Sequence, residues 1–339
     1  MGAILVVNAG STSLKLSAVA GDEATEPVES LEAVPDDIEA VAHRVVHGGA
    51  RFRDPVLIDD EVERELGGLT ELAPLHNAPA LRAIVEARRL LPDVPHIAVF
   101  DTAFHSTLPA EAATYALPRR WREDWGIRRY GFHGLSVQWA AEQVPVPRLV
   151  VCHLGGGCSV TAVREGHSVE TTMGFTPLEG VPMATRPGSI DVEIVLYLLR
   201  HGLASQEEIE AALESGSGLL GLSGSSARVE ELERANDEAA RLALDVFCYR
   251  IAAAIGAMAV ALGGLDALVF TAGVGEGSAL VRRRVCNRLA FLGVELDAQA
   301  NDAARPDTDV STEGSKVRVV VLHAREELVA ARAARSLLD

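Results

Sequence analysis

Several short segments of the chain combine histidine, arginine or aspartate with small residues and follow apolar runs. Such side chains supply positive charge, hydrogen-bond donors and carboxylate oxygens, which together can hold and transfer an anionic group. An α/β fold collects residues of this kind at the ends of its strands, where its active site lies. The segments are 43–49, 74–77, 100–105, 130–134, 173–180 and 185–191.

Three further segments are rich in glycine, serine and threonine, at residues 8–15, 153–159 and 271–278. Backbone N–H groups and hydroxyls in such turns can surround a phosphate, and Lys15 can add a positive charge to the first of them. Lys15 and Lys316 are the only lysines beside 29 arginines. The Walker pattern G-x-x-x-x-G-K-[ST] is absent from the sequence, and an ordinary hairpin turn remains the alternative for residues 8–15.

An internal repeat relates the two halves of the chain. Residues 5–19 read LVVNAGSTSLKLSAV and residues 149–163 read LVVCHLGGGCSVTAV. Each is an apolar strand, a turn of small residues and a second strand, which predicts two matching hairpins. A hairpin opening each half indicates a duplicated domain.

The remaining pattern alternates strands with helices. Apolar runs predict strands at 40–46, 97–100, 267–271 and 317–322, and helical periodicity predicts helices at 78–91, 229–262 and 326–338. The long helix should break near residues 236–237, where an N-cap is expected. This alternation favours mostly parallel sheets with ligands near the strand ends. A boundary near residues 145–147 gives domains 1–147 and 148–316, with 317–339 packing back on the first.

Composition narrows the classes of partner. The 339 residues fit two domains, and the formal net charge of −17 disfavours nucleic acid and anionic membranes. Four scattered cysteines form no C-x-x-C pair, so neither a zinc site nor a disulfide framework is expected. The start of the chain has no basic region typical of a signal peptide, and the apolar stretch 251–262 is too short to span a bilayer. These features predict a cytoplasmic protein.

Taken in order, the motifs resemble the acetate kinase (acetokinase) family of short-chain acyl kinases. They are V-N-A-G-S-T-S-L-K, H-R-V-V-H-G-G, A-P-L-H-N, F-D-T-A-F-H, Y-G-F-H-G, C-H-L-G-G-G, M-G-F-T-P-L-E-G, T-R-P-G-S-I-D, F-T-A-G-V-G-E and E-E-L, spanning residues 7–328. The resemblance implies the duplicated fold shared by actin, Hsp70 and sugar kinases, with two domains around a cleft. It implies a homodimer that transfers a phosphoryl group from ATP to acetate, giving acetyl phosphate and ADP reversibly.

The resemblance also assigns roles to individual positions. It implies that Asp101, His133 and Arg186 are catalytic, that Arg44 and His76 bind substrate, and that Asn8 and Glu326 hold Mg²⁺, for which Mn²⁺ can substitute. The implied ATP-binding residues form a longer set. They are Ser11, Ser13, Lys15, His153, Leu154, Gly155, Gly156, Gly157, Arg228, Val229, Glu230, Gly273, Val274, Gly275, Glu276 and Gly277.

A carboxylate acceptor simplifies the expected chemistry. Carboxyl groups titrate near pH ~4, so acetate is ionised at neutral pH and needs no general base before it attacks phosphorus. The protein has to align the reactants and neutralise the phosphoryl oxygens, which suits Arg44, Arg186 and His133 together with Mg²⁺. Asp101 is therefore expected to position Mg²⁺, water or an arginine, although the alternative role of a base stays open.

Some positions depart from the family pattern. Gly156 stands where the family usually has asparagine, and 228–230 reads Arg-Val-Glu in place of Asp-Phe-Arg. Gly277 and Arg325 replace common asparagines, and the region 21–40 is short. These departures bear on nucleotide preference more than on reaction type. Two alternatives remain: a kinase for propionate or butyrate, and a non-catalytic nucleotide-binding regulator.

Overall fold

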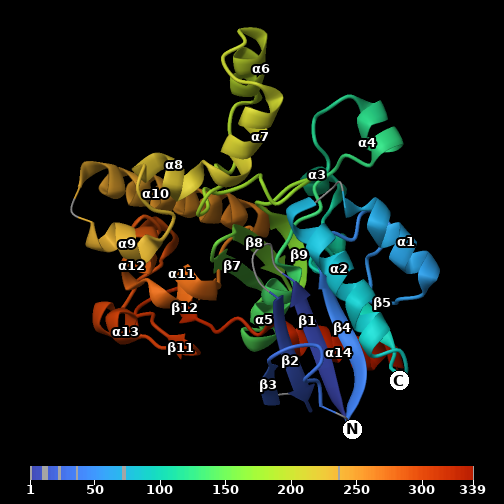
Figure 1. The fold of residues 1–339 in the computed structure, drawn as a ribbon. Coiled ribbons are helices and arrows are strands. Elements are labelled where there is room, and N and C mark those ends of the chain that lie inside the picture. Colours follow the sequence, from blue (N-terminus) through green and yellow to red (C-terminus); the bar gives the residue numbers. More distant parts are fainter. Residues whose placement is uncertain are drawn as a thin grey trace.

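Two mixed sheets with the same strand order form the framework of the protein. The computed structural model describes residues 2–9, 14–21, 24–35, 37–70, 74–235 and 237–338. Within them the first sheet has the order β3-β2-β1-β4-β6-β5 and the second β9-β8-β7-β10-β12-β11 (Figure 1). The strands of the first are β1 (Ala3–Ala9), β2 (Leu14–Ala20), β3 (Ala24–Val28), β4 (Ile38–Val45), β5 (Val56–Leu57) and β6 (His96–Phe100). Those of the second are β7 (Arg148–Leu154), β8 (Cys158–Arg164), β9 (His167–Thr171), β10 (Ala267–Thr271), β11 (Thr308–Asp309) and β12 (Arg318–Val321).

The pairing of the strands repeats as closely as their order. In each sheet an antiparallel meander of three strands comes first (β1-β2-β3 and β7-β8-β9). Its first strand then pairs in parallel with β4 or β10, which pair in parallel with β6 or β12. A short antiparallel strand closes each edge. The duplication predicted from residues 5–19 and 149–163 is confirmed, because the two halves of the chain build the same arrangement of strands.

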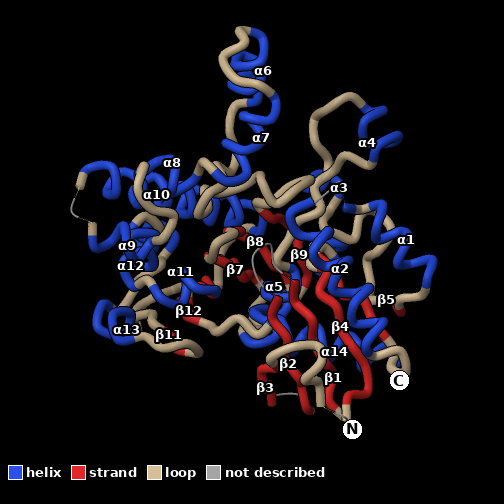
Figure 2. Tube along the Cα trace, viewed as in Figure 1, coloured by secondary structure: helices blue, strands red, loops and turns tan. Residues whose placement is uncertain are grey.

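Helices separate and cover the sheets (Figure 2). The first half contains α1 (Asp60–Gly68), α2 (Pro74–Leu90), the 3₁₀ helix η2 (Ala103–Thr107), α3 (Ala110–Ala113), α4 (Arg119–Trp125) and α5 (Gly134–Gln143). The middle contains α6 (Val192–Arg200), α7 (Gln206–Ser215), α8 (Gly218–Ser223), α9 (Val229–Arg234) and α10 (Glu238–Leu262). The last part contains α11 (Ala272–Gly277), α12 (Ala279–Asn287), the 3₁₀ helix η3 (Ala290–Leu292), α13 (Ala298–Ala303) and α14 (Glu326–Leu338).

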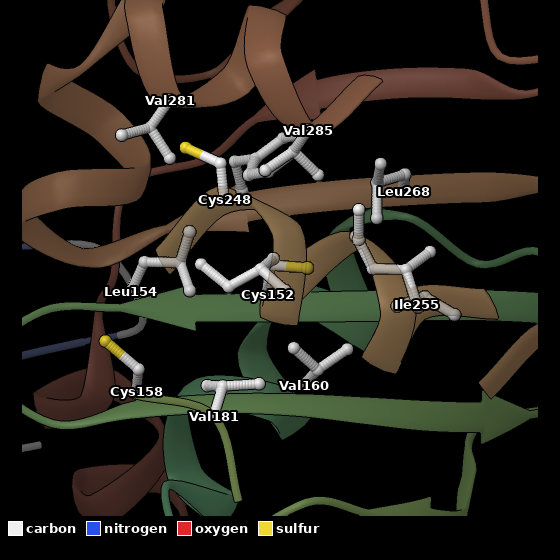
Figure 3. Packing of buried hydrophobic residues seen from close by; sticks show 14 of the residues in the cluster. Cys152, Leu154, Cys158, Val160, Val181, Cys248, Ile255, Leu268, Val281 and Val285 are labelled. Atoms are coloured by element: carbon white, nitrogen blue, oxygen red, sulfur yellow. The ribbon is translucent and has the colours of Figure 1, made fainter. Parts of the chain in front are cut away.

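The core is layered, and β1 shows why. Its residues alternate between two faces, so Ile4 and Val6 pack with α5, α14 and the second sheet, whereas Leu5 and Val7 pack with α2. The other face of the second sheet packs against α10 and α12, where Cys152, Ile255 and Val285 share one apolar cluster (Figure 3). Helices α5 and α14 thus lie between the two sheets and fix how the sheets face each other.

Most elements agree with the sequence-based expectations. The predicted strand 267–271 and helix 326–338 match β10 and α14 residue for residue, and the other predicted strands and helix 78–91 shift by one to four residues. The long helix does break where expected: α9 ends at Arg234 and α10 starts at Glu238, with Asp237 accepting a hydrogen bond from the Ala240 N–H.

Helix α10 is long and apolar enough to cross a membrane by length and composition alone. Half of its most apolar stretch is buried in the protein, where Ile251, Ile255 and Met258 pack in the core of the second half. The stretch 251–262 thus belongs to a core helix, as predicted, but this helix is 25 residues long, so burial rather than length distinguishes it from a membrane span.

Candidate active site

Three predicted site residues meet at the carboxyl ends of neighbouring strands in the first sheet. Asn8 on β1 is paired with Arg44 on β4, and on its other side with Lys15 on β2. Asp101 directly follows β6, the strand beyond β4. Parallel strands place their carboxyl ends at one edge, so residues 36 and 57 positions apart in the sequence become neighbours.

Arg44 is the centre of this group. Its Nε and Nη2 atoms donate to the two oxygens of Asp101 at 3.1 and 2.5 Å, and Nη1 donates to Asn8 Oδ1 at 3.0 Å. Glu326, from the start of α14, places Oε2 3.7 Å from Nε. Burial disfavours the charged guanidinium, but Asp101 and Glu326 outweigh it and raise the pKa of Arg44. Four residues predicted for catalysis, substrate and metal therefore form one ionic cluster.

Asp101 is fully buried, and its environment contains opposing charges. Burial raises the pKa of its carboxyl group, the Arg44 guanidinium lowers it and the Glu326 carboxylate raises it again, with a net upward shift. Both carboxylate oxygens are already engaged by one arginine. Asp101 is therefore arranged to hold Arg44 in place.

Two imidazole rings from opposite sides of the site are stacked. His133 precedes α5, and His153 lies near the end of β7; their ring centroids are 4.0 Å apart with an interplanar angle of 20°. His133 has a backbone φ of 59°, a left-handed conformation that is uncommon outside glycine. This conformation costs energy and persists only because the surrounding structure holds it. Such strain is typical of a residue that is held for function.

A serine from the opposite element holds each of these rings. His133 Nδ1 is 3.0 Å from Ser159 Oγ on β8, and His153 Nδ1 is 2.8 Å from Ser136 Oγ on α5. Burial lowers the pKa of His133 well below its usual range, and His153, Arg44 and Arg186 lower it further. Burial also lowers the pKa of His153 to about 4. Both rings are neutral at pH 7, with fixed orientations.

Arg186 approaches the same point from the segment before α6. Its Nη1 donates to Pro177 O at 2.8 Å, and burial lowers the pKa of its guanidinium, which nevertheless stays charged at neutral pH. A methyl group added at Gly157 would lie 2.9 Å from Arg186 Nη2 and 3.2 Å from His133 Nε2. Both nitrogens therefore border the Gly155–Gly157 turn, where an ATP phosphate is expected.

A pocket of about 270 Å³ lies beside this turn. Four separate segments of the second half line it, including Gly156, Ala184, Val229 and Val274. Its walls come mainly from small side chains and backbone. At its mouth Arg228 pairs with Glu230 at 3.1 Å and with Glu231 at 3.4 Å. Val229 is buried in the apolar core as well as lining the pocket, so no aromatic ring stands at that position.

The segment 271–278 differs from the expected open loop, because residues 272–277 form the short helix α11. Ala272 turns the chain sharply after β10 with a φ of 64°, and buried Arg282 donates to the carbonyl oxygens of Gly275 and Glu276. The Glu276 carboxylate accepts from the Ala324 N–H at 3.0 Å and lies 2.7 Å from His323 Nδ1. Its side chain therefore ties α11 to the segment before α14. The Leu154 side chain is fully buried in the core, which leaves its backbone for any ligand.

Histidines near the site support its walls. His47 Nδ1 accepts from the Gly49 N–H, and His105 Nε2 lies 2.9 Å from Phe132 O, next to His133. Burial lowers the pKa of both His47 and His105 to about 4. These two histidines are structural members of the motifs in which they occur.

The predicted residues are thus divided among three places. Asn8, Arg44, Asp101 and Glu326 form the ionic cluster, and His133, His153, Gly157 and Arg186 form the central group. The pocket is lined by Gly155, Gly156, Arg228, Val229, Glu230, Gly273, Val274 and Gly277. Outside these places, Gly275 and Glu276 lie in α11, Leu154 lies in β7, and Lys15 lines a smaller cavity with Asn8 and Arg44. Ser11 and Ser13 lie outside the described residues, as does the side chain of His76. The sequence did not predict Ser136 or Ser159 as site residues, although Ser159 belongs to the glycine-rich segment 153–159 that drew attention to His153.

Comparisons with known proteins agree on one family. The sequence matches the profile of the acetokinase family over residues 23–332. Acetate kinases of Nostoc punctiforme and Gloeobacter violaceus are 47% and 49% identical over 86% and 88% of this chain, and 74% and 76% of their own lengths. Among solved structures, a propionate kinase of Francisella tularensis has a TM-score of 0.90 at 33% identity, covering 98% of this chain and 99% of its own. The acetate kinase of Porphyromonas gingivalis has a TM-score of 0.88 at 32% identity over all of both chains.

Proposed function

The chain belongs to the acetokinase family, and on that premise we propose how its site transfers a phosphoryl group from ATP to acetate. The enzyme is a phosphotransferase with a carboxyl group as acceptor, and it makes acetyl phosphate and ADP reversibly. The observation that carries the proposal is the convergence of Arg44, Arg186 and His133 on one site. This set neutralises anions on both reactants and contains no residue that must first remove a proton.

The acid attacks phosphorus directly. Acetate is ionised at neutral pH, so its oxygen is already nucleophilic. Arg44 binds the carboxylate, and Arg186 with His133 contacts the equatorial phosphoryl oxygens from the side of the Gly155–Gly157 turn. When the Ser159 hydroxyl donates to His133 Nδ1, the neutral ring carries its hydrogen on Nε2, beside Arg186 Nη2. The Nε2–H group then donates a hydrogen bond to an oxygen of the transferred phosphoryl group.

Before metal and acid bind, Asp101 acts as a positioning residue for Arg44. It holds two nitrogens of the guanidinium in a bidentate pair, which fixes both the distance and the plane of the group. A carboxylate acceptor gives it no proton to remove. The role of a general base is therefore unnecessary in this chemistry.

The kinase family requires a divalent metal, and the oxygens of Asn8, Asp101 and Glu326 fit Mg²⁺, with Mn²⁺ as a substitute. Among the described residues no group of three or more histidine, cysteine, aspartate or glutamate side chains forms a metal site. Two carboxylates and one amide instead suit a hard cation that keeps several waters and binds substrate phosphates. A cavity of about 60 Å³, lined by Asn8, Lys15, Arg44 and Glu326, offers room beside these oxygens. When bound, the ion neutralises charge on the phosphates.

The nucleoside of ATP is expected in the pocket of about 270 Å³ beside Gly156. Lys15 and the Gly155–Gly157 turn would contact the phosphates. With Val229 in place of a phenylalanine, the base has no ring on which to stack. Phosphate contacts then supply most of the affinity.

We assign residues 1–147 to a substrate-side domain and 148–316 to a nucleotide-binding domain, in a cytoplasmic enzyme. The final segment 317–339 is shared: β12 belongs to the second sheet, and α14 packs between the sheets on β1 and β4.

A homodimer is also proposed, with α6 as the contact between copies. Figure 1 shows α6 and α7 projecting from the body, and none of the nine residues of α6 is buried although seven are apolar. Val192 and Ile194 are 72% and 51% exposed. A helix that is apolar all round is normally covered by protein.

The two charged residues of α6 favour a second copy of this chain as the protein that covers the helix. Glu193 and Arg200 are two turns apart and share one face, where they lie 2.6 Å apart. In an antiparallel pair of α6 helices, Glu193 of each copy faces Arg200 of the other, which gives the self-complementary contact of a two-fold axis. Ile194→Asp should convert a dimer to a monomer in sedimentation velocity, while Val260→Asp, at an exposed position of α10, should not. A monomeric wild type, or an unchanged Ile194→Asp dimer, contradicts the assignment.

Turnover tests the function itself. With MgATP and hydroxylamine, acetate should yield acetyl hydroxamate. Because one similar structure is a propionate kinase, propionate and butyrate should be compared with acetate as acceptors. No turnover with any of the three acids and any nucleotide donor would contradict the enzyme and favour a non-catalytic nucleotide-binding regulator.

A further inference from the structure

The guanidinium of Arg44 occupies the centre of the oxygen cluster to which the divalent metal has been assigned. Its nitrogens contact Asn8 Oδ1 at 3.0 Å, Asp101 Oδ1 at 3.1 Å and Glu326 Oε2 at 3.7 Å. The same side chains are the metal-site residues of the proposed function. One positive group therefore already contacts an oxygen of each of these three side chains.

We infer that Arg44 and the divalent cation compete for these oxygens, so that metal binding releases Arg44 to take the substrate carboxylate. The inference rests on the proposed function. It adds an order to the reaction: the metal, with or without nucleotide, binds before the acid.

The hydrogen bonds of Arg44 explain why release is needed. Nε, Nη1 and Nη2 each donate to a protein oxygen, and the Nε–Nη2 edge that would bind a carboxylate in a bidentate pair is held by Asp101. The Arg44 side chain is only 15% exposed. An incoming acetate would have to displace the buried carboxylate of Asp101, which directly follows β6 and accepts from both nitrogens of this edge.

Charge balance explains why a cation can achieve the release. The cluster holds two carboxylates and one guanidinium, so an added Mg²⁺ meets two anionic groups and one repelling cation. Oxygens that turn toward the metal weaken their bonds to Arg44, and the repulsion drives the guanidinium away. The nearby cavity of about 60 Å³, which Arg44 also lines, gives the ion and its waters a point of entry.

Arg186 provides a matched control, because it carries the same charge in the same site but makes a different contact. Its Nη1 donates to the carbonyl of Pro177, and no ion pair to Asp101 or Glu326 is formed by it in the described residues. A general effect of positive charge on metal binding should appear in both arginine variants. Competition for the oxygens should appear only when Arg44 is changed.

The first test measures Mn²⁺ binding by electron paramagnetic resonance, without nucleotide or acid. Arg44→Gln should bind Mn²⁺ at least tenfold more tightly than the wild type, and Arg186→Gln should stay within threefold. An unchanged or weaker affinity of Arg44→Gln, or an equal gain in both variants, would overturn the competition.

The second test uses the wild type, so it does not depend on the folding of a variant. Phenylglyoxal labels accessible arginines, and mass spectrometry can quantify the adduct at Arg44 relative to that at Arg186. Saturating Mg²⁺ should raise the labelling of Arg44 several-fold with little change at Arg186. Unchanged or reduced labelling of Arg44 would overturn its release. Neither test contains ATP or acetate, so a failure here is distinct from a failure of the kinase activity.

Discussion

The Gly155–Gly157 turn offers a direct test of how closely the transferring groups are packed. A methyl group at Gly157 would lie 2.9 Å from Arg186 Nη2 and 3.2 Å from His133 Nε2, whereas one at Gly156 would meet nothing within 4 Å. Neither glycine has a backbone conformation that excludes alanine. The adjacent substitutions Gly157→Ala and Gly156→Ala therefore differ mainly in what the new methyl group touches.

The magnitude follows from the displacement. Ordinary contact begins at 3.4 Å, so the Arg186 terminus must move by 0.5 Å, from 2.9 to 3.4 Å, and His133 by 0.2 Å. Arg186 can swing, but His133 is held by Ser159 and stacked on His153. Loss of one transition-state donor typically costs about 10²–10³-fold in rate, and a misplacement of about 1 Å can cost about 10²-fold, so a shift that breaks the contact of Arg186 or His133 with the transferred group should cost about 10²-fold.

Steady-state kinetics with acetate and MgATP can check the pair. We expect kcat of Gly157→Ala to fall by about 10²-fold, kcat of Gly156→Ala to stay within threefold of the wild type, and both thermal midpoints to match it. If kcat of Gly157→Ala lies within threefold of that of Gly156→Ala, the placement of Arg186 and His133 beside the transferred group is wrong. A large loss of thermal stability in Gly157→Ala would assign the glycine to folding.

Three further expectations follow from the same site. Arg186→Ala should lower kcat by about 10²–10³-fold with a smaller change in KM for acetate, because its charge acts mainly in the transition state; unchanged kcat with a raised KM would assign it to substrate binding. Because Val229 stands in place of a stacking ring, the values of kcat/KM for ATP and GTP should differ by less than about a hundredfold, or ~2.7 kcal/mol. A stronger preference for ATP would show that another group recognises the base. Buried His47, His105 and His153 have pKa values of about 4, against ~6.5 when unfolded, so the unfolded chain binds more protons between these values. As the pH is lowered below ~6.5, the free energy of unfolding should therefore decrease, by up to about 1.4 kcal/mol per pH unit for each histidine. If urea unfolding gives the same free energy from pH ~6.5 to pH ~5, these histidines are not buried in their neutral form.

The sequence predicted the framework because the framework depends on local patterns. Apolar strands and small-residue turns repeat at 5–19 and 149–163, and the sheets that contain them have the same order and pairing. Arg44 and Asp101 follow apolar runs, which was enough to place them at strand ends. The parallel pairing of β4 with β6 then brought them into contact.

Contacts across the molecule could not be predicted in this way. Ser136 is one of several small residues on α5, and only the approach of β7 makes it the partner of His153. The position of Arg44 among Asn8, Asp101 and Glu326 depends on α14 returning to the first sheet from the far end of the chain. The segment that forms α11 was expected to be a loop because it is rich in glycine. The hydrogen bonds that Arg282 donates to the Gly275 and Glu276 carbonyl oxygens could not be predicted from the sequence.

The stereochemistry at phosphorus distinguishes direct attack by the acid from transfer through a phosphorylated side chain. ATP made chiral at its γ-phosphorus with oxygen isotopes would be converted to acetyl phosphate, and the configuration of the product determined. Direct in-line attack by the carboxylate, with Arg44, Arg186 and His133 contacting only oxygens, predicts inversion in a single displacement. Retention of configuration would mean two displacements through a phosphorylated side chain, and it would contradict the account.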